Sequence, residues 1–104
     1  MTKQTANTYV SRIYKACRDE SLVVIVKKMN GLTGLAEHKT VTLDHRTDLL
    51  PTFIHEMLHV IYPTWSETKV LKHEDQIVNK LSKVQVRRLL GLIVQLLELN
   101  KDAS

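Results

Sequence analysis

The chain has 104 residues, which suits a single domain, and its 43% hydrophobic and 25% charged residues are typical of a folded globular protein. No apolar run approaches the length of a membrane span, so we expect no membrane partner. The N-terminus, MTKQTANTYVSRIYK, is polar and lacks the apolar stretch of a signal peptide, which favours a cytoplasmic protein.

The charge balance hints only weakly at an anionic partner. The net charge is +4 and the pI is near 9.3, but the basic residues are spread along the chain and aromatic residues make up 5% of it. Nucleic acid is therefore an unlikely partner. Cys17 is the only cysteine, so an internal disulfide is excluded and the residue is expected in the core.

The N-terminal half predicts one helix and two strands. Residues 5–18 have helical periodicity, carried by Tyr9, Val10, Ile13, Tyr14 and Cys17. Residues 21–29 include consecutive β-branched side chains and predict a strand. Asn30-Gly31 and Gly34 indicate a turn or loop, and the alternating residues 40–43, TVTL, predict a second, half-exposed strand.

A second helix is predicted from DHRTDLLPTFIHEMLHVIYP. Thr47 or Asp48 can cap it, Pro51 fits within its first turn, and Pro63 stops it near residue 61 or 62. Its apolar stripe consists of Leu50, Phe53, Ile54, Met57, Leu58 and Ile61.

Two more helices follow. Ser66 is placed to cap a helix over roughly 67–81, and Ser82 with Gln85 forms a capping-box pattern for a helix over about 83–99. This last helix is apolar around much of its circumference. It is therefore either wedged between other elements or facing a partner, so the expected state is a monomer or a homodimer through this helix.

The pentapeptide HEMLH carries the chemistry. His55 and His59 are four residues apart, so on a helix they share a face and can chelate one Zn²⁺. Glu56 lies beside His55, where it can take a proton from a zinc-bound water without ligating the metal. The alternative is a pair of exposed histidines on an ordinary amphipathic helix. The capped, amphipathic helix preceded by a strand favours the zinc site.

A catalytic zinc needs a third protein ligand, and no histidine stands in the HExxHxxGxxH position. In the 67–81 helix the apolar stripe of residues 70, 71, 77, 78 and 81 is interrupted by Glu67 and Glu74. Both carboxylates should therefore point inward, where each needs a partner. We expect Glu67, directly after the bend at Pro63, to be the ligand and Glu74 to support a histidine. Two alternatives stay open: either Glu74 is the third ligand in place of Glu67, or Glu67 is an acid that only complements the helix dipole.

The stretch DHRTDLLPTFIHEMLHVIYPTWSE resembles the zincin-type metallopeptidases, in particular the minimal gluzincins with their HExxH…E pattern. The resemblance is strongest over residues 40–81. It implies an α+β fold, in which a small sheet packs on the active-site helix and a backing helix carries the ligand glutamate. Together with the segments predicted on either side of this stretch, residues 1–104 should form one zincin-like domain. Its elements are a two- or three-stranded sheet, the HExxH helix, the glutamate helix, and N- and C-terminal helices.

The resemblance also implies residue roles. His55 and His59 match the histidine ligands, Glu56 the general base and Glu67 the gluzincin glutamate, although larger gluzincins place that glutamate much further along. The strand Thr40–Asp44 is implied to form the cleft rim that pairs with an extended peptide.

The expected function is that of a zinc-dependent hydrolase, a metallopeptidase acting on a peptide or protein substrate. Tyr62 is a candidate for stabilising the oxyanion of the reaction, against the alternative that it packs at the bend, where Trp65 is expected as an anchor. Three other functions stay open. One is a weakly active or latent zincin-like module that binds zinc, and another is a SprT-like protease acting near DNA. The third is a nucleic-acid-associated adaptor that uses the basic C-terminal half, with the HEMLH pattern fortuitous.

Overall fold

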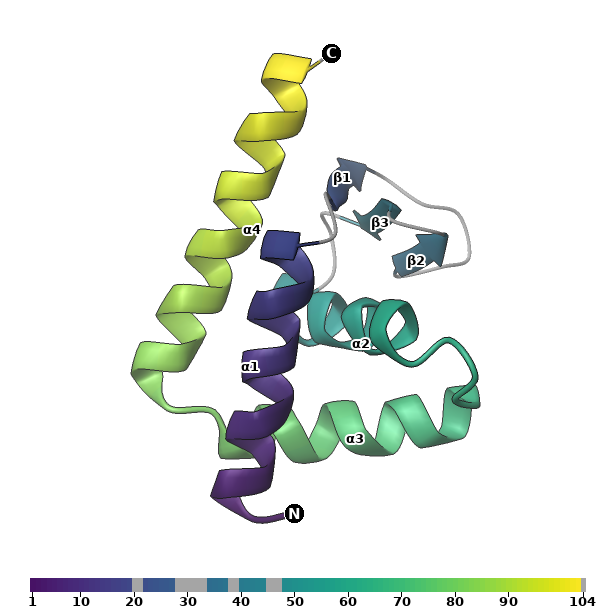
Figure 1. Cartoon of the computed structure of the whole chain (residues 1–104), viewed down its shortest axis with the longest axis vertical. Helices are drawn as coiled ribbons and strands as arrows, with labels where there is room; N and C mark the ends of the chain where they lie inside the picture. Colours follow the sequence, from purple (N-terminus) through teal and green to yellow (C-terminus); the bar gives the residue numbers. More distant parts are fainter. Residues whose placement is uncertain (20–21, 28–33, 38–39, 45–47, 104) are drawn as a thin grey trace.

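The computed structural model describes residues 1–19, 22–27, 34–37, 40–44 and 48–103. Four helices and three strands follow one another along these residues (Figure 1): α1 (Lys3–Asp19), β1 (Val23–Lys27), β2 (Gly34–Glu37), β3 (Thr40–Asp44), α2 (Leu49–Ile61), α3 (Glu67–Lys80) and α4 (Lys83–Ala103). The predicted α+β class is confirmed, with a small sheet among helices.

The three strands form one sheet in the order β1-β3-β2. β1 is parallel to β3, with Val24 opposite Val41, and β2 is antiparallel to β3, with Leu35 opposite Thr42. β3 is therefore the central strand, with both of its edges hydrogen-bonded. The expectation that Thr40–Asp44 forms the cleft rim that pairs with an extended peptide is wrong, because neither edge of β3 is left to pair.

The free edge next to α2 belongs instead to β2. This strand begins at Gly34, which the sequence assigned to a turn or loop, while Asn30-Gly31 lies outside the described residues. Within the described part of the chain no strand pairs with the outer edge of β2.

The central strand is more buried than its alternating sequence suggested. Val41 and Leu43 are completely buried, and Thr42 is buried as well, so the half-exposed strand expected over residues 40–43 is wrong. In an isolated hairpin the polar threonine would face water, but here β3 is enclosed by a strand on each side. The threonine is buried in spite of its polarity.

The core lies between the sheet and the helices. α2 packs against α1, α3, β2 and β3, and in Figure 1 it runs along one face of the sheet, with α3 beyond it. The largest fully buried side chains of this core are Ile13, Val24, Val41, Leu43, Phe53, Ile54, Met57, Leu58, Val70, Ile77, Leu89 and Ile93. Because α2 is covered on several sides, its orientation is fixed by packing, and with it the face of the helix on which His55 and His59 lie.

Two of the helix starts, those of α3 and α4, follow the predicted capping chemistry. Ser66 Oγ accepts a hydrogen bond from the Lys69 backbone N–H at 3.2 Å. Ser82 and Gln85 exchange hydrogen bonds of 2.9 and 3.1 Å, which is the capping box. Asp48 occupies the N-cap position of α2, but its side chain makes no capping bond. Local hydrogen bonds therefore fix where α3 and α4 begin.

α4 is only partly covered by the rest of the protein. Leu89, Ile93 and Leu96 are buried, whereas Leu90 and Val94 are exposed. The predicted homodimer would depend on that exposed stripe.

Among the described residues, no helix combines the length and apolar character needed to span a membrane.

Candidate metal centre

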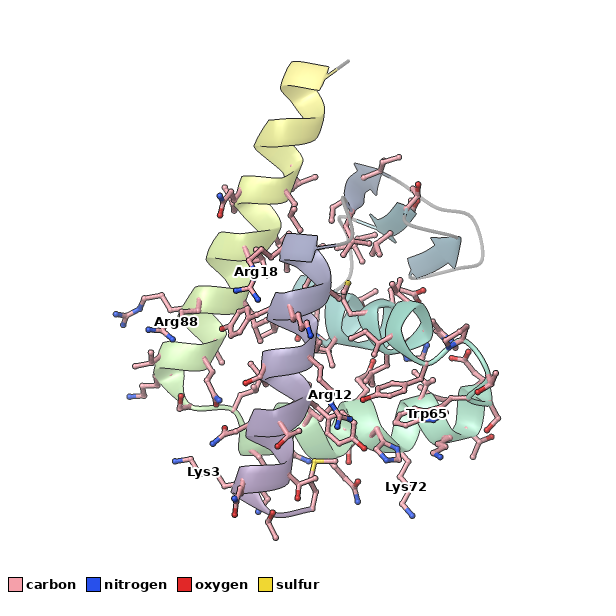
Figure 2. The ribbon with its side chains drawn as sticks, in the orientation of Figure 1. Lys3, Arg12, Arg18, Trp65, Lys72 and Arg88 are labelled. Atoms are coloured by element: carbon pink, nitrogen blue, oxygen red, sulfur yellow. The ribbon has the colours of Figure 1, made fainter. Side chains whose placement is uncertain are left out.

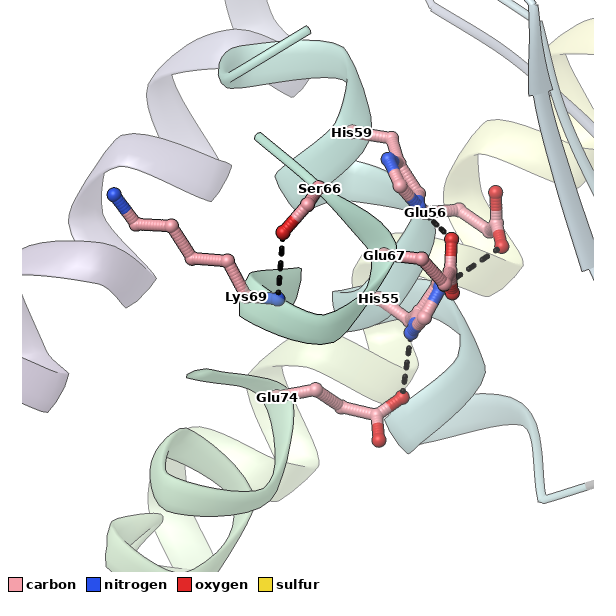
Figure 3. A network of polar contacts seen from close by, with 7 residues as sticks. All are labelled: His55, Glu56, His59, Ser66, Glu67, Lys69 and Glu74. Atoms are coloured by element: carbon pink, nitrogen blue, oxygen red, sulfur yellow. Dashed lines mark hydrogen bonds and ion pairs between the residues drawn. The ribbon is translucent and has the colours of Figure 1, made fainter. Parts of the chain in front are cut away.

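Two histidines and a glutamate converge where α2 and α3 face each other (Figure 3). His55 Nε2 lies 2.6 Å from one carboxylate oxygen of Glu67, and His59 Nε2 lies 2.9 Å from the other. Each of the three residues offers one donor atom, and these three donor atoms lie within 4.8 Å of one another. This group can hold a metal ion.

The geometry follows from the helices. His55 and His59 are one turn apart on α2, with ring centroids 5.0 Å apart, so both rings leave the same face. Glu67 is the first residue of α3, immediately after the Ser66 cap. The connection through residues 62–66 reverses the chain and brings that first turn back to the histidines.

His55 is held on both sides of its ring. Its Nδ1 lies 3.3 Å from a carboxylate oxygen of Glu74, two turns further along α3 than Glu67. An Nδ1–H that donates to Glu74 leaves the lone pair on Nε2, which faces Glu67, available to a metal. Glu74 therefore lies where the sequence placed a supporting carboxylate.

Glu56 is buried beside this group. Its carboxylate oxygen lies 3.9 Å from His55 Nε2, so it is near the converging donors without being one of them. Burial is the largest cause of a raised pKa at Glu56; the two histidines oppose the shift, and the carboxylates of Glu67 and Glu74 add to it. A carboxyl group with a raised pKa is a better proton acceptor than an ordinary one.

The inward face of α3 differs from the stripe read from the sequence. Val70 and Ile77 are fully buried, but Leu71 is 49% exposed. The side chain of Glu67 is 61% exposed, so it lies at the border of the core and not inside it. The two glutamates do share one flank of the helix, and that flank faces the histidines.

Tyr62 lies at the bend between α2 and α3, stacked on Trp65 with ring centroids 4.1 Å apart. Its hydroxyl accepts a hydrogen bond from the Arg12 guanidinium of α1. This placement corresponds to the alternative that Tyr62 packs at the bend. Its hydroxyl is engaged by Arg12 instead of being directed to the metal centre. No sequence pattern pointed to Arg12, because Arg12 and Tyr62 are far apart along the chain.

No family model, curated protein or solved structure matches the chain. The case for a metal centre therefore depends on its own geometry.

The donor set fits a divalent metal such as zinc. Imidazole nitrogen and carboxylate oxygen are ordinary Zn²⁺ ligands, and three protein donors leave a coordination position open. The orienting carboxylate at Nδ1 of His55 is the kind of partner that ligand histidines usually have. The exposed carboxylate of Glu67 keeps the group accessible from solvent.

Proposed function

We propose that this protein is a zinc-dependent hydrolase that cleaves peptide bonds. The observation that carries the proposal is the convergence of His55, His59 and Glu67 beside the buried Glu56. The donors supply a site for the metal, and the fourth residue supplies a proton acceptor that the metal does not occupy.

The metal and the chain divide the chemistry. A zinc ion held by the three donors supplies a Lewis acid that polarises a carbonyl group and lowers the pKa of water. Glu56 takes the proton from the attacking water and later gives it to the leaving amine. Its burial supports this role, since the raised pKa brings the carboxyl closer to the pH at which it must both accept and release a proton.

Glu74 fixes the direction in which His55 acts. An Nδ1–H donated to Glu74 restricts rotation of the ring and keeps the Nε2 lone pair directed at the site. A ring without this partner would have a second tautomer and more rotational freedom, and both reduce metal affinity.

The outer edge of β2 is the place for an extended substrate. A peptide that adds as a strand needs unpaired backbone groups, and β2 offers such an edge within the described sheet while β3 does not. α2, which carries the histidines, packs against β2. Support for peptides as the substrate class comes from this edge beside the proposed centre.

The first test is metal content. Protein purified without chelators should contain close to one zinc per chain by elemental analysis, and His55→Ala and Glu67→Ala should each lower that content. Asp75→Ala is a matched control, because it removes an exposed acid from the same helix as Glu67. Wild-type protein that binds no zinc would end the proposal.

The second test is turnover. Zinc-loaded wild type should cleave unstructured peptides, and Glu56→Gln should lose roughly 10²- to 10⁴-fold in rate while keeping its zinc. If zinc is present and neither protein cleaves any peptide, the chain is a zinc-binding interaction module and not a peptidase. Equal cleavage by both proteins would remove Glu56 from the proposed mechanism.

A further inference from the structure

Four aromatic rings gather at the bend between α2 and α3. Tyr62 and Trp65 stack with their planes 7° apart, and Tyr9 of α1 meets their edges at centroid distances of 6.1 and 6.2 Å. His73 of α3 completes the group, with its ring 4.5 Å from Trp65 and 5.6 Å from Tyr9. The rings come from α1, from the connection between α2 and α3, and from α3, and they are only half-buried.

Two cations close this group from outside. The Arg12 guanidinium donates to the Tyr62 hydroxyl and lies 6.0 Å from the Tyr62 ring centroid. Lys69 Nζ lies 4.5 Å from the centroid of Trp65. Cations over aromatic faces are attracted by the ring electrons. We call these six residues the aromatic clamp: Tyr9, Arg12, Tyr62, Trp65, Lys69 and His73. In Figure 2, Arg12 lies beside α1 and Trp65 lies over α3.

The clamp holds the segment that sets the spacing of the metal centre. Tyr62 follows His59 by three residues, and Trp65 precedes Glu67 by two. The backbone N–H of Trp65 donates to the Tyr62 carbonyl at 3.1 Å, which closes the turn between the stacked rings. The connection from His59 to Glu67, residues 60–66, thus contains two clamp residues, Tyr62 and Trp65, together with the Ser66 cap.

We propose that the aromatic clamp presets the metal centre, holding Glu67 opposite the histidines before any metal arrives. Tyr62, Trp65 and Arg12 are then positioning residues, and α1 contributes to metal affinity without supplying a ligand. The inference rests on the proposed zinc binding. The physical basis is preorganisation. A site that already has its binding geometry spends no free energy on ordering when the metal binds. With a loose connection only a fraction of the chains has that geometry, and the apparent zinc affinity is reduced by this fraction.

The effect of the clamp is measured as the zinc affinity of the folded, metal-free protein, which is determined by competition with a chromophoric chelator. Trp65→Ala should bind zinc roughly 10-fold to 100-fold more weakly, in the range found when groups that orient ligands are removed. Trp65→Phe keeps a stacking ring and should recover most of the loss. Arg12→Ala, which removes only an exposed side chain, should show a smaller loss in the same direction.

Leu96→Ala is the matched control for stability. Leu96 is buried in α4, so its truncation should destabilise the fold, but it lies outside the clamp and should leave zinc affinity unchanged in the folded protein. Circular dichroism sets a temperature at which every variant is folded. Equal zinc affinity in Trp65→Ala and wild type would overturn the inference, and so would an equal loss in Leu96→Ala.

The fluorescence of Trp65, the only tryptophan, tests presetting directly. Its emission maximum and its quenching by acrylamide should be nearly the same in metal-free and zinc-loaded wild type, because the stack is already formed. A large change on zinc binding would show that the connection rearranges and would overturn the inference. A wild type with no zinc affinity would instead refute the proposed function, so the two failures are distinguishable.

Discussion

Glu74 faces His55 across 3.3 Å, on the opposite side of the imidazole from Glu67. The imidazole ring of His55 therefore lies between two carboxylates that are two turns apart on α3. This arrangement makes Glu74 testable apart from the ligands themselves.

Replacing Glu74 should weaken zinc binding without removing a ligand. We expect Glu74→Ala to lose about 10- to 100-fold in zinc affinity, because His55 loses the acceptor that fixes its tautomer. Glu74→Gln should lose less, since its amide oxygen still accepts from Nδ1–H. Isothermal titration of metal-free proteins measures both zinc affinities, with Lys72→Ala, which removes an exposed side chain of the same helix, as control. Unchanged affinity in Glu74→Ala would show that the contact does not orient the ring.

Glu56→Gln should stabilise the metal-free protein, and the gain should depend on pH. The pKa of Glu56 is raised in the folded state, so between the ordinary carboxyl pKa and that raised value the folded chain binds more protons than the unfolded chain. Wild-type stability therefore falls as pH rises through this window, and glutamine lacks the effect. Urea unfolding from about pH 4 to about pH 8 should show the variant's advantage growing with pH. An advantage that does not change with pH would contradict the raised pKa.

Ser66→Ala should lower the free energy of unfolding by about 1 kcal/mol, because the Lys69 N–H loses its acceptor at the start of α3. Ser66→Thr retains a hydroxyl and should lose much less. Denaturant titration of the metal-free proteins measures the free energy of unfolding of both variants, since metal binding then does not contribute to stability. A stability equal to wild type in Ser66→Ala would mean that water replaces the cap at no cost.

The Cys17 thiol should be inert in the folded protein. Burial raises its pKa to about 12, so thiolate is scarce near neutral pH and reagents have little access. Ellman's reagent at about pH 8 should react slowly with native protein and rapidly after addition of denaturant. The same raised pKa predicts that stability falls as pH rises from about 9 towards 12, where the unfolded thiol is ionised and the folded one is not. Rapid labelling of native protein would contradict the burial.

The helices could be predicted well because their signals are local. The Ser66 cap, the Ser82–Gln85 box and the stop at Pro63 each act over a few residues, and the observed helices begin or end beside them. The final helix runs past the predicted residue 99, where no stop signal could be identified in the sequence.

The sheet was harder to predict because strand pairing is not local. β2 has the sequence GLAE, which lacks β-branched and aromatic residues, so its strand conformation depends on pairing with β3. The central position of β3 likewise depends on neighbours on both sides, and the alternation of TVTL cannot reveal those neighbours.

The candidate site was predictable in its donors and not in its supports. The spacing of His55, His59 and Glu67 follows from helix periodicity and one short bend, and the structure brings the three together. Arg12 and Tyr9 reach the bend from the other end of the chain, and only the packing of α1 against α2 and α3 shows their contact.

Every donor and carboxylate of the proposed centre lies within a single helical hairpin, α2 and α3, so the set is contiguous in sequence. Such a hairpin looks transferable to another scaffold by grafting one segment. Yet the ring of Tyr9 and the guanidinium of Arg12 would be left behind, and so would the strands that cover α2. A graft that carries only the hairpin should bind zinc more weakly than the intact chain, and adding α1 should restore part of the difference.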